Sequence, residues 1–294
     1  MNSPDIRNIL IRPNVSIKLE YLNHPVISGN KFRKLKYNLE EARKQNHSRL
    51  LTFGGAYSNH IVATAAAGKA FNFETIGVIR GDELATKPLN SSLEYAKKCG
   101  MQLKFISRKE YQERHSSKFI DRLKSALGDF YFIPEGGTNA LAVKGCEEIL
   151  SKEDTEFDLI CCPVGTGGTI AGIINSSSSN QTVLGFPALK GNFLDKEIAQ
   201  WTEKNNLELI TDYHFGGYAK INSELISFIN RFKTDYGIPL DPVYTGKMMY
   251  GLVDMINSGK IDRSTKVLAI HTGGLQGIDG MNLRLKNMNL PQLI

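Results

Sequence analysis

Cysteine is scarce in this sequence, and the few residues present lack the spacing of a metal site or a disulfide framework. Four cysteines occur in 294 residues: Cys99 and Cys146 are isolated, whereas Cys161 and Cys162 are adjacent. No pair has the CxxC spacing of zinc sites, and adjacent residues of a strand point to opposite faces of its sheet. We therefore expect reduced, buried thiols and no metal.

Long apolar runs are also lacking. The sequence has no uninterrupted apolar run of about 18 residues, the length that suits a membrane-spanning helix. Its first ten residues, MNSPDIRNIL, contain no apolar core of a signal peptide. We therefore expect a cytoplasmic protein without membrane contact.

Charge of one sign is only slightly in excess. The 36 Lys and Arg residues are spread among 30 acidic ones, which gives a net charge of +6. Without a basic cluster nucleic-acid binding is not indicated, whereas a small anionic ligand suits this charge. The length, with 41% hydrophobic residues, allows a substantial core in two domains or in one large α/β unit.

Apolar bursts that end in glycine alternate with stretches of helical character. The bursts indicate buried strands at 49–55, 74–81, 130–137, 159–168, 182–189 and 267–274, and the stretches between them predict helices at 59–70, 88–100, 139–152 and 221–237. This alternation predicts an α/β fold with mostly parallel sheets and helices on both faces. We expect two sheets, built from about 40–138 and from 139 onward, and a surface loop at 175–180.

Pairs of glycines follow four of the predicted strands, at 54–55, 136–137, 167–168 and 273–274. In parallel α/β sheets the carboxyl ends of the strands line the ligand crevice. We therefore expect these four strand ends to form the walls of one site.

The segment CPVGTGGTIAG, residues 162–172, has the strongest anion signature. A strand, a glycine-rich turn and a helix bring several backbone N–H groups to a helix N-terminus, which suits a phosphate. Ile170 replaces the third glycine of the dinucleotide fingerprint, and the Walker A spacing is absent. The alternative is a tight turn that needs positive φ.

The segment FGGAYSNH, residues 53–60, places polar side chains at the start of the next predicted helix. Ser58 and Asn59 suit a substrate carboxylate or a ring hydroxyl, although either could simply cap the helix. We interpret His60 as a polar residue of the first turn rather than a catalytic base.

Two lysines and two tyrosines are candidates for the chemistry itself. Lys31 and Lys34 are three residues apart and share one face of a helix, so one positive charge can lower the pKa of the other amine. The alternative for this basic run is a solvated helix face, and this is the interpretation given to Arg33. Tyr218 and Tyr244 each follow a turn, and each is an acid or base only if its hydroxyl faces a ligand.

Six segments follow one another along nearly the whole chain: GNKFRKLKYNL (29–39), FGGAYSNH (53–60), IPEGGTNALAVKG (133–145), VGTGGTIAG (164–172), DPVYTGK (241–247) and HTGG (271–274). Taken together and in this order, they resemble the pyridoxal-phosphate enzymes of fold type II, which include the tryptophan synthase beta chain. Within that group the chain resembles the family of 1-aminocyclopropane-1-carboxylate deaminase and D-cysteine desulfhydrase.

The resemblance implies a role for each matching residue. Lys31 carries pyridoxal 5'-phosphate as a Schiff base, and Lys34 contacts its phosphate. Asn59 bonds the 3′-oxygen of the cofactor, and Ser58 lies near the substrate carboxylate or the α-carbon. The phosphate is expected at Gly165, Thr166, Gly167, Gly168 and Thr169, the substrate at Tyr218 and Tyr244, and the pyridine nitrogen at Thr245 or Thr272.

The resemblance also implies an architecture. A large cofactor-binding domain is expected from residues 1–37 and 139–294, with a small α/β domain, 38–138, inserted into it. The cofactor would lie between the two domains, and the protein would be a homodimer.

Two departures from the family pattern bear on the substrate. Cyclopropane deaminases have an acid at the position of Thr245, where a carboxylate keeps the pyridine nitrogen protonated and strengthens the electron sink. A threonine favours β-elimination, which tolerates a weaker sink because the leaving group departs with the electrons. Tyr57 replaces the usual glutamine, so we expect an altered carboxylate or side-chain pocket.

The sequence therefore predicts a lyase that acts on a small amino acid, of D configuration, with a leaving group on Cβ. Lys31 would take the α-proton, and Tyr244 with Tyr218 would protonate the leaving group, giving a 2-oxo acid and ammonia. A cyclopropane deaminase, an amino-acid racemase and a non-catalytic cofactor-binding protein remain alternatives.

Overall fold

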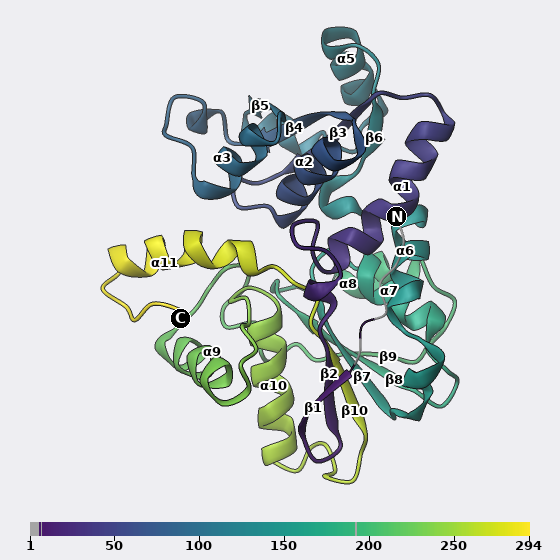
Figure 1. Cartoon of the computed structure of the whole chain (residues 1–294), viewed down its shortest axis with the longest axis vertical. Coiled ribbons are helices and arrows are strands. Elements are labelled where there is room, and N and C mark those ends of the chain that lie inside the picture. Colours follow the sequence, from purple (N-terminus) through teal and green to yellow (C-terminus); the bar gives the residue numbers. More distant parts are fainter. Residues whose placement is uncertain (1–5, 7, 192) are drawn as a thin grey trace.

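The strands of the protein form two sheets. The computed structural model describes residues 6, 8–191 and 193–294. Over these residues one sheet has six strands in the order β1-β2-β10-β7-β8-β9, and the other has four in the order β5-β4-β3-β6. Figure 1 shows the four-stranded sheet at the top of the molecule and the six-stranded sheet below it. The prediction of two sheets is confirmed.

All six predicted strands are present. In the six-stranded sheet the strands are β1 (Asn8–Arg12), β2 (Val15–Lys18), β7 (Leu159–Val164), β8 (Thr182–Pro187), β9 (Leu207–Leu209) and β10 (Val267–Ile270). The other sheet contains β3 (Arg49–Gly54), β4 (Glu74–Arg80), β5 (Gln102–Ile106) and β6 (Tyr131–Ile133). Within the described residues every pairing is parallel except that of β1 with β2, so the prediction of mostly parallel sheets is confirmed.

The helices flank these sheets. They are α1 (Asn30–Lys44), α2 (Asn59–Phe71), α3 (Ser91–Lys98), α4 (Arg108–Gln112), α5 (Ser117–Leu127), α6 (Ala140–Cys146), α7 (Gly168–Ser176), α8 (Leu194–Ala199), α9 (Ser223–Tyr236), α10 (Thr245–Asn257) and α11 (Ile278–Asn287). Helices α2, α3, α6 and α9 match the four predicted ones. Of the predicted loop at 175–180, residues 177–180 lie between α7 and β8, whereas the first two are the last residues of α7.

Strands β1, β2, β5 and β9 were not predicted. β9 has only three residues, and β5 and β9 are edge strands that are buried incompletely. β1 is an antiparallel edge strand with Leu10 exposed. β2 is buried, but its sequence VSIK alternates apolar and polar residues, so neither β1 nor β2 shows the continuous apolar run of the central strands. The six-stranded sheet therefore also takes two strands from the start of the chain.

Helix α1 links the two sheets. Figure 1 shows it running from the level of the lower sheet toward the upper one. Its Phe32, Leu35 and Leu39 pack in one core cluster with Leu50 of β3 and Ile133 of β6. The helix that carries both candidate lysines is therefore fixed by apolar packing. The predicted domain boundaries near 37 and 138 stay a prediction.

The cysteines lie largely as expected. Cys161 and Cys162 belong to different core clusters, on opposite faces of β7, and both are reduced. Cys146 is also buried, but Cys99 is partly exposed, which corrects the expectation that all four are buried.

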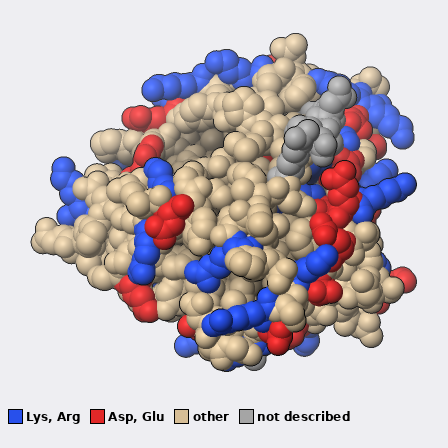
Figure 2. Space-filling model, turned by 60° about the horizontal axis from the view of Figure 1, so that its bottom comes forward, with Lys and Arg blue, Asp and Glu red and all other residues tan. Residues whose placement is uncertain are grey.

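The described residues show neither a membrane span nor a metal site. No helix among them is long and apolar enough to cross a membrane, and no cluster of three potential metal ligands occurs. Figure 2 shows acidic and basic side chains interspersed on the face that it presents.

Candidate active site

The two candidate lysines of α1, Lys31 and Lys34, contact the turn that follows β6. The carbonyl oxygen of Gly136 accepts hydrogen bonds from Lys31 Nζ at 3.2 Å and from Lys34 Nζ at 3.0 Å. Gly136 and Gly137 have φ of +67° and +72°, a conformation that favours glycine. This turn presents one carbonyl group to both amines.

Lys34 has further partners from a second strand end. Its Nζ donates to Thr138 Oγ1 at 2.9 Å and to Thr166 Oγ1 at 3.4 Å, and these two hydroxyls lie 2.6 Å apart. Burial lowers the pKa of Lys34 to about 8. Thr138 was not singled out from the sequence, although it lies in a quoted segment.

Lys31 is the more perturbed of the two amines. Desolvation lowers its pKa well below the usual value, and the positive charge of Lys34 lowers it further. A lowered pKa makes the neutral amine of Lys31 more accessible than that of an exposed lysine, which suits a base or a nucleophile.

The glycine-rich turn after β7 lies against Lys34. Gly167 precedes α7 with φ of +82° and gives the helix no side-chain cap, and a Cβ atom on Gly168 would lie 3.2 Å from Lys34 Nζ. The Oγ1 atom of Thr169 accepts from Asn30 Nδ2 at 2.9 Å, which connects this turn to α1. The sequence left open whether these glycines serve a tight turn with positive φ or an anion site. The structure has both a positive φ, at Gly167, and an uncapped helix N-terminus in the same turn.

These residues fit an anionic group. Two amines, one of them almost fully buried, lie together, and no carboxylate among the described residues forms an ion pair with Lys31 or Lys34. The uncapped N-terminus of α7 adds positive potential beside Lys34. An anion bound here would compensate both.

The two candidate tyrosines lie together near the same turn. The rings of Tyr218 and Tyr244 have centroids 6.2 Å apart in an edge-to-face arrangement, and Tyr244 Oη lies 3.4 Å from the Cβ position of Gly165. Burial raises the pKa of Tyr244 well above its usual value, and the neighbouring Tyr218 raises it further. Tyr244 is therefore protonated at neutral pH and is a potential proton donor.

A buried carboxylate that the sequence reasoning missed holds the start of α10. Asp241 Oδ2 accepts from the backbone N–H groups of Val243 and Tyr244, at 2.9 and 3.0 Å. Its Oδ1 accepts from the N–H and the hydroxyl of Thr245, both at 2.7 Å. The Thr245 hydroxyl is therefore engaged with Asp241. An Asp before Pro at a helix start is a turn signal that could have revealed this residue.

The remaining candidates, Thr272, Asn59 and Ser58, lie near the ends of β10 and β3. The Thr272 carbonyl accepts from Asn30 N at 3.0 Å, and Asn59 Nδ2 lies 3.1 Å from the Cβ position of Gly274. Ser58 Oγ accepts from Ile61 N at 3.3 Å, so it caps α2, while its hydroxyl proton is free for another acceptor. Asn59 thus brings the start of α2 to the end of β10, whereas Ser58 lies against Gly54 at the end of β3.

Tyr57 lies at the edge of this group of residues. Its side chain is 48% exposed, and its ring lies 2.5 Å from the Cβ position of Gly280 in α11. A side chain at Gly280 would collide with the ring, so α11 and the loop before α2 fit closely here.

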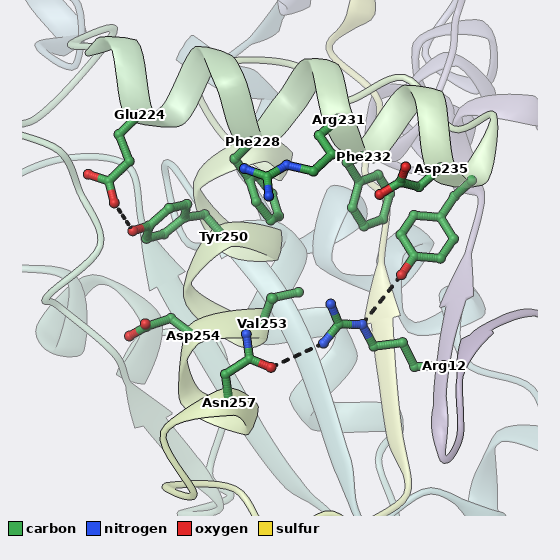
Figure 3. Close-up of a pocket in the computed structure, with 11 residues that line it drawn as sticks. Arg12, Glu224, Phe228, Arg231, Phe232, Asp235, Tyr250, Val253, Asp254 and Asn257 are labelled. Carbon is green, nitrogen blue, oxygen red and sulfur yellow. Dashed lines mark hydrogen bonds between the residues drawn. The ribbon is translucent and has the colours of Figure 1, made fainter.

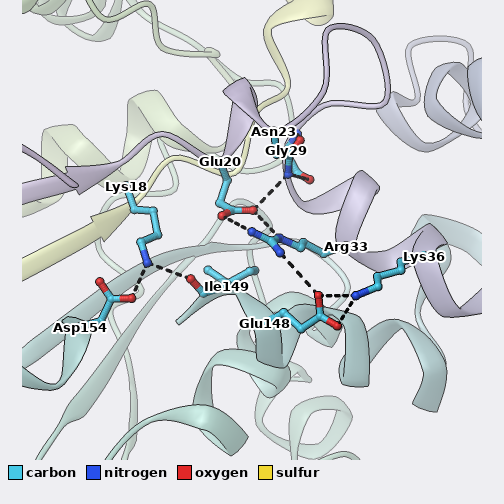
Figure 4. A network of polar contacts seen from close by, with 9 residues as sticks. All are labelled: Lys18, Glu20, Asn23, Gly29, Arg33, Lys36, Glu148, Ile149 and Asp154. Atoms are coloured by element: carbon cyan, nitrogen blue, oxygen red, sulfur yellow. Dashed lines mark hydrogen bonds and ion pairs between the residues drawn. The ribbon is translucent and has the colours of Figure 1, made fainter. Parts of the chain in front are cut away.

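The interpretation of Arg33 as part of a solvated helix face is wrong. It is 3% exposed, and its Nε and Nη2 donate to the two oxygens of buried Glu20, both at 2.9 Å. Glu148 lies 3.6 Å from Arg33 Nη1 and also binds Lys36 (Figure 4). The ion pairs fix α1, and with it both candidate lysines, against the start of the chain.

Replacing Glu20 tests the importance of this pair. We expect Glu20→Gln to lower the free energy of unfolding by about 3 kcal/mol, because it leaves a buried guanidinium with only the more distant Glu148. Glu113→Gln, which breaks an exposed pair with Arg122, should change it by less than about 1 kcal/mol. Urea unfolding monitored by circular dichroism measures both, and equal losses would contradict this role for Glu20.

A separate pocket lies away from the lysines. It has a volume of about 320 Å³ between α9 and α10, and Figure 3 shows Arg12 reaching toward it, bonded to Asn257 and to a tyrosine. It contains none of the predicted site residues. The lysine cluster, with its buried cations and converging strand ends, is the better candidate for catalysis.

Comparison with known proteins agrees with this choice. The sequence profile of the family of pyridoxal-phosphate dependent enzymes matches residues 3–273. A Thermotoga maritima relative, whose name as a 1-aminocyclopropane-1-carboxylate deaminase is provisional, is 34% identical over 295 residues, which cover 92% of each chain. An Arabidopsis thaliana relative named as a bifunctional D-cysteine desulfhydrase/1-aminocyclopropane-1-carboxylate deaminase is 32% identical and covers 86% of this chain and 70% of its own. A crystal structure of an ACC deaminase homologue matches with a TM-score of 0.77 at 31% identity, covering 92% of this chain and 88% of that one.

The chain is therefore a pyridoxal-phosphate-dependent enzyme of fold type II. It belongs to the family of 1-aminocyclopropane-1-carboxylate deaminases and D-cysteine desulfhydrases, which confirms the resemblance found in the sequence. Its cofactor is pyridoxal phosphate.

Proposed function

We propose that the enzyme catalyses β-elimination from a small D-amino acid, with D-cysteine as the representative substrate. Hydrogen sulfide leaves from Cβ, and water completes the reaction to pyruvate and ammonia. The name of the Arabidopsis relative joins this activity with cyclopropane deamination, so the choice between the two depends on the residues of this chain.

The observation that carries the proposal is the hydroxyl chemistry at the two positions assigned to the pyridine nitrogen. Thr245 has no carboxylate, and its hydroxyl is engaged with Asp241. Asp241 already accepts four hydrogen bonds, so its carboxylate has no free donor-binding position of good geometry. The remaining group is Thr272, which is neutral. This arrangement favours elimination, in which the leaving group departs with the electrons.

Each residue then has a stated task. Pyridoxal phosphate, when bound, supplies an electron sink that acidifies the α-carbon of the substrate. Lys31 is proposed as the residue that binds it covalently and, once displaced by the substrate amine, accepts the α-proton at Nζ. Lys34 and the Gly165–Thr169 turn are proposed to bind the phosphate, with Asn59 on the 3′-oxygen and Ser58 near the substrate carboxylate.

Departure of the thiol needs a proton donor on the substrate side. Tyr244 is proposed for this role, because its phenol is protonated at neutral pH and lies against Gly165 of the glycine-rich turn, with Tyr218 beside it. As the Cβ–S bond breaks, the proton of Tyr244 passes to the departing sulfur, so neutral hydrogen sulfide rather than the charged hydrosulfide ion leaves a buried site.

A substrate screen tests the proposal. Product release is measured for D-cysteine, L-cysteine, D-serine and 1-aminocyclopropane-1-carboxylate with purified holoenzyme. We expect pyruvate and ammonia with the highest kcat/KM from D-cysteine. A higher kcat/KM for release of 2-oxobutanoate from the cyclopropane amino acid, or racemisation without ammonia, would contradict the proposal.

Binding of the phosphate group should depend on pH through Lys34. Its pKa of about 8 means that it is charged below this pH and loses its proton above it. We expect the affinity for pyridoxine 5′-phosphate, which cannot form a Schiff base, to fall by up to about tenfold per pH unit above pH 8. Fluorescence titration between pH 7.5 and 9.5 measures this, and an unchanged slope in Lys34→Met would contradict the assignment.

Two further properties are proposed from the resemblance alone. We infer a homodimer, which sedimentation velocity tests directly. A cytoplasmic location is inferred on the same ground, and fractionation of cells that produce the protein tests it.

A further inference from the structure

His60 is buried, although the sequence reasoning interpreted it as a polar residue of the first helical turn. It is the second residue of α2, only 1% of it is exposed, and its ring lies inside the interface between α2 and β3. A buried imidazole usually pairs both of its nitrogens. Only one nitrogen is paired here.

The partner of Nε2 fixes the tautomer. Thr52 Oγ1, in β3, lies 2.9 Å from His60 Nε2 and 2.8 Å from the carbonyl oxygen of Ile133. A hydroxyl has a single proton, and the carbonyl group can only accept, so that proton belongs to the bond with Ile133. His60 Nε2 must therefore carry the hydrogen and donate to Thr52, which leaves Nδ1 as an unprotonated acceptor when the ring is neutral.

The ring is held neutral, and its Cε1–Nδ1 edge lies against the turn that both lysines contact. Desolvation lowers the pKa of His60 well below its usual value, and the charges of Lys31 and Lys34 lower it further, so both amines lie near the ring. Nδ1 lies 3.2 Å from the Cβ position of Gly137, the residue after the carbonyl group that both lysines share. Among the described residues Nδ1 has no hydrogen-bond partner.

Lys31 has the opposite deficit. The amine of Lys34 has three acceptors, namely Gly136 O, Thr138 Oγ1 and Thr166 Oγ1, one for each of its protons. For Lys31 the described residues provide Gly136 O, which Lys34 also uses. A protonated Lys31 therefore has N–H groups without an acceptor among the described residues, and His60 Nδ1, near the same turn, is a buried acceptor without a donor.

We propose that His60 is a positioning residue whose Nδ1 accepts a hydrogen bond from the Lys31 amine when the cofactor site is occupied and that amine is not bound to the cofactor. In the structure itself Lys31 Nζ donates to Gly136 O and Nδ1 has no partner among the described residues, so the pairing requires the amine to turn toward the ring. The inference deepens the proposed function, since it rests on Lys31 as the residue that releases the cofactor and takes the α-proton. Thr52 sets the ring orientation, and His60 then holds the proton-bearing amine beside the reacting atoms. Without this acceptor the amine has several rotamers open to it, and its protonated form loses a charge-assisted hydrogen bond.

Two substitutions separate the nitrogens of the ring. Asparagine places an acceptor near the position of Nδ1, whereas glutamine reaches the position of Nε2 and can still donate to Thr52. We expect His60→Gln to lower kcat for D-cysteine by about ten- to a hundredfold with KM within about twofold and the visible cofactor band retained. His60→Asn should recover most of the lost kcat. A higher kcat for His60→Gln than for His60→Asn would overturn the proposal.

Nitrogen-15 NMR of histidine-labelled wild-type protein provides a readout that needs neither turnover nor a variant at His60. Lys31 is covalently engaged in the complex with pyridoxal phosphate, but its amine stays free in the complex with pyridoxine 5′-phosphate. We expect the Nδ1 resonance to shift upfield in the second complex, in the direction of hydrogen bonding, and to shift back when Lys31→Ala binds the same ligand.

A Nδ1 resonance that is the same in both complexes, or one that ignores Lys31→Ala, would overturn the proposal. Failure of the proposed function is distinguishable from this result. If Lys31 does not bind pyridoxal phosphate covalently, the visible band is absent from the first complex, whereas the comparison of wild type with Lys31→Ala in the second complex still measures the pairing with His60.

Discussion

Lys31→Ala is expected to remove the visible absorbance band of the cofactor and to lower turnover of D-cysteine by at least about 10³-fold. The band requires a covalent bond to a lysine, and the reaction requires a base at the α-carbon. One side chain is proposed for both tasks. Absorbance spectra and kcat measured on the same preparations test the two losses together.

Lys34→Met is the matched control, because both residues lie on α1 and both bind Gly136. It should keep the band at saturating cofactor and weaken cofactor binding. The assignment of the two lysines would be reversed if Lys34→Met abolished the band while Lys31→Ala retained it.

Tyr244→Phe is expected to affect substrates according to their leaving groups. With D-cysteine, kcat/KM should fall roughly 10²- to 10⁴-fold, since the departing sulfur loses its proton donor. With D-3-chloroalanine it should fall far less, because chloride leaves without a proton. Steady-state kinetics with both substrates gives the ratio directly.

Tyr213→Phe is the control for this experiment. The Tyr213 hydroxyl donates to Asp254 at 2.8 Å and contacts neither lysine, so Tyr213→Phe should leave the ratio of kcat/KM for the two substrates unchanged. Equal losses for D-cysteine and D-3-chloroalanine in Tyr244→Phe would show that Tyr244 does not protonate the leaving group.

The parts of the fold that the sequence predicted are those with local signals. Buried parallel strands are continuous apolar runs, and glycine marks the point where such a strand turns into a site, as at Gly136 and Gly167. The strands β1, β2, β5 and β9 lack this signal, because polar residues interrupt β2, β5 and β9 and limit β1 to a short apolar run, whereas the edge strand β6 belongs to an apolar run that ends in two glycines.

The site residues divide in the same way. Lys31 and Lys34 stand out by spacing, and the turn at 165–169 by its glycines. Arg33, His60 and Asp241 gain their meaning from partners distant in sequence or from burial, which no local pattern contains. In the sequence Arg33 is one of several neighbouring basic residues, and only its contact with Glu20 in the structure distinguishes it from a solvated charge.

The separation of roles between the two lysines of α1 is the central claim, and one measurement addresses it. Reduction of the holoenzyme with borohydride, followed by digestion and mass spectrometry, locates the residue that carries the cofactor. The account predicts the pyridoxyl group on Lys31 and none on Lys34. A label on Lys34, or no labelled lysine in a holoenzyme that is active, would contradict it.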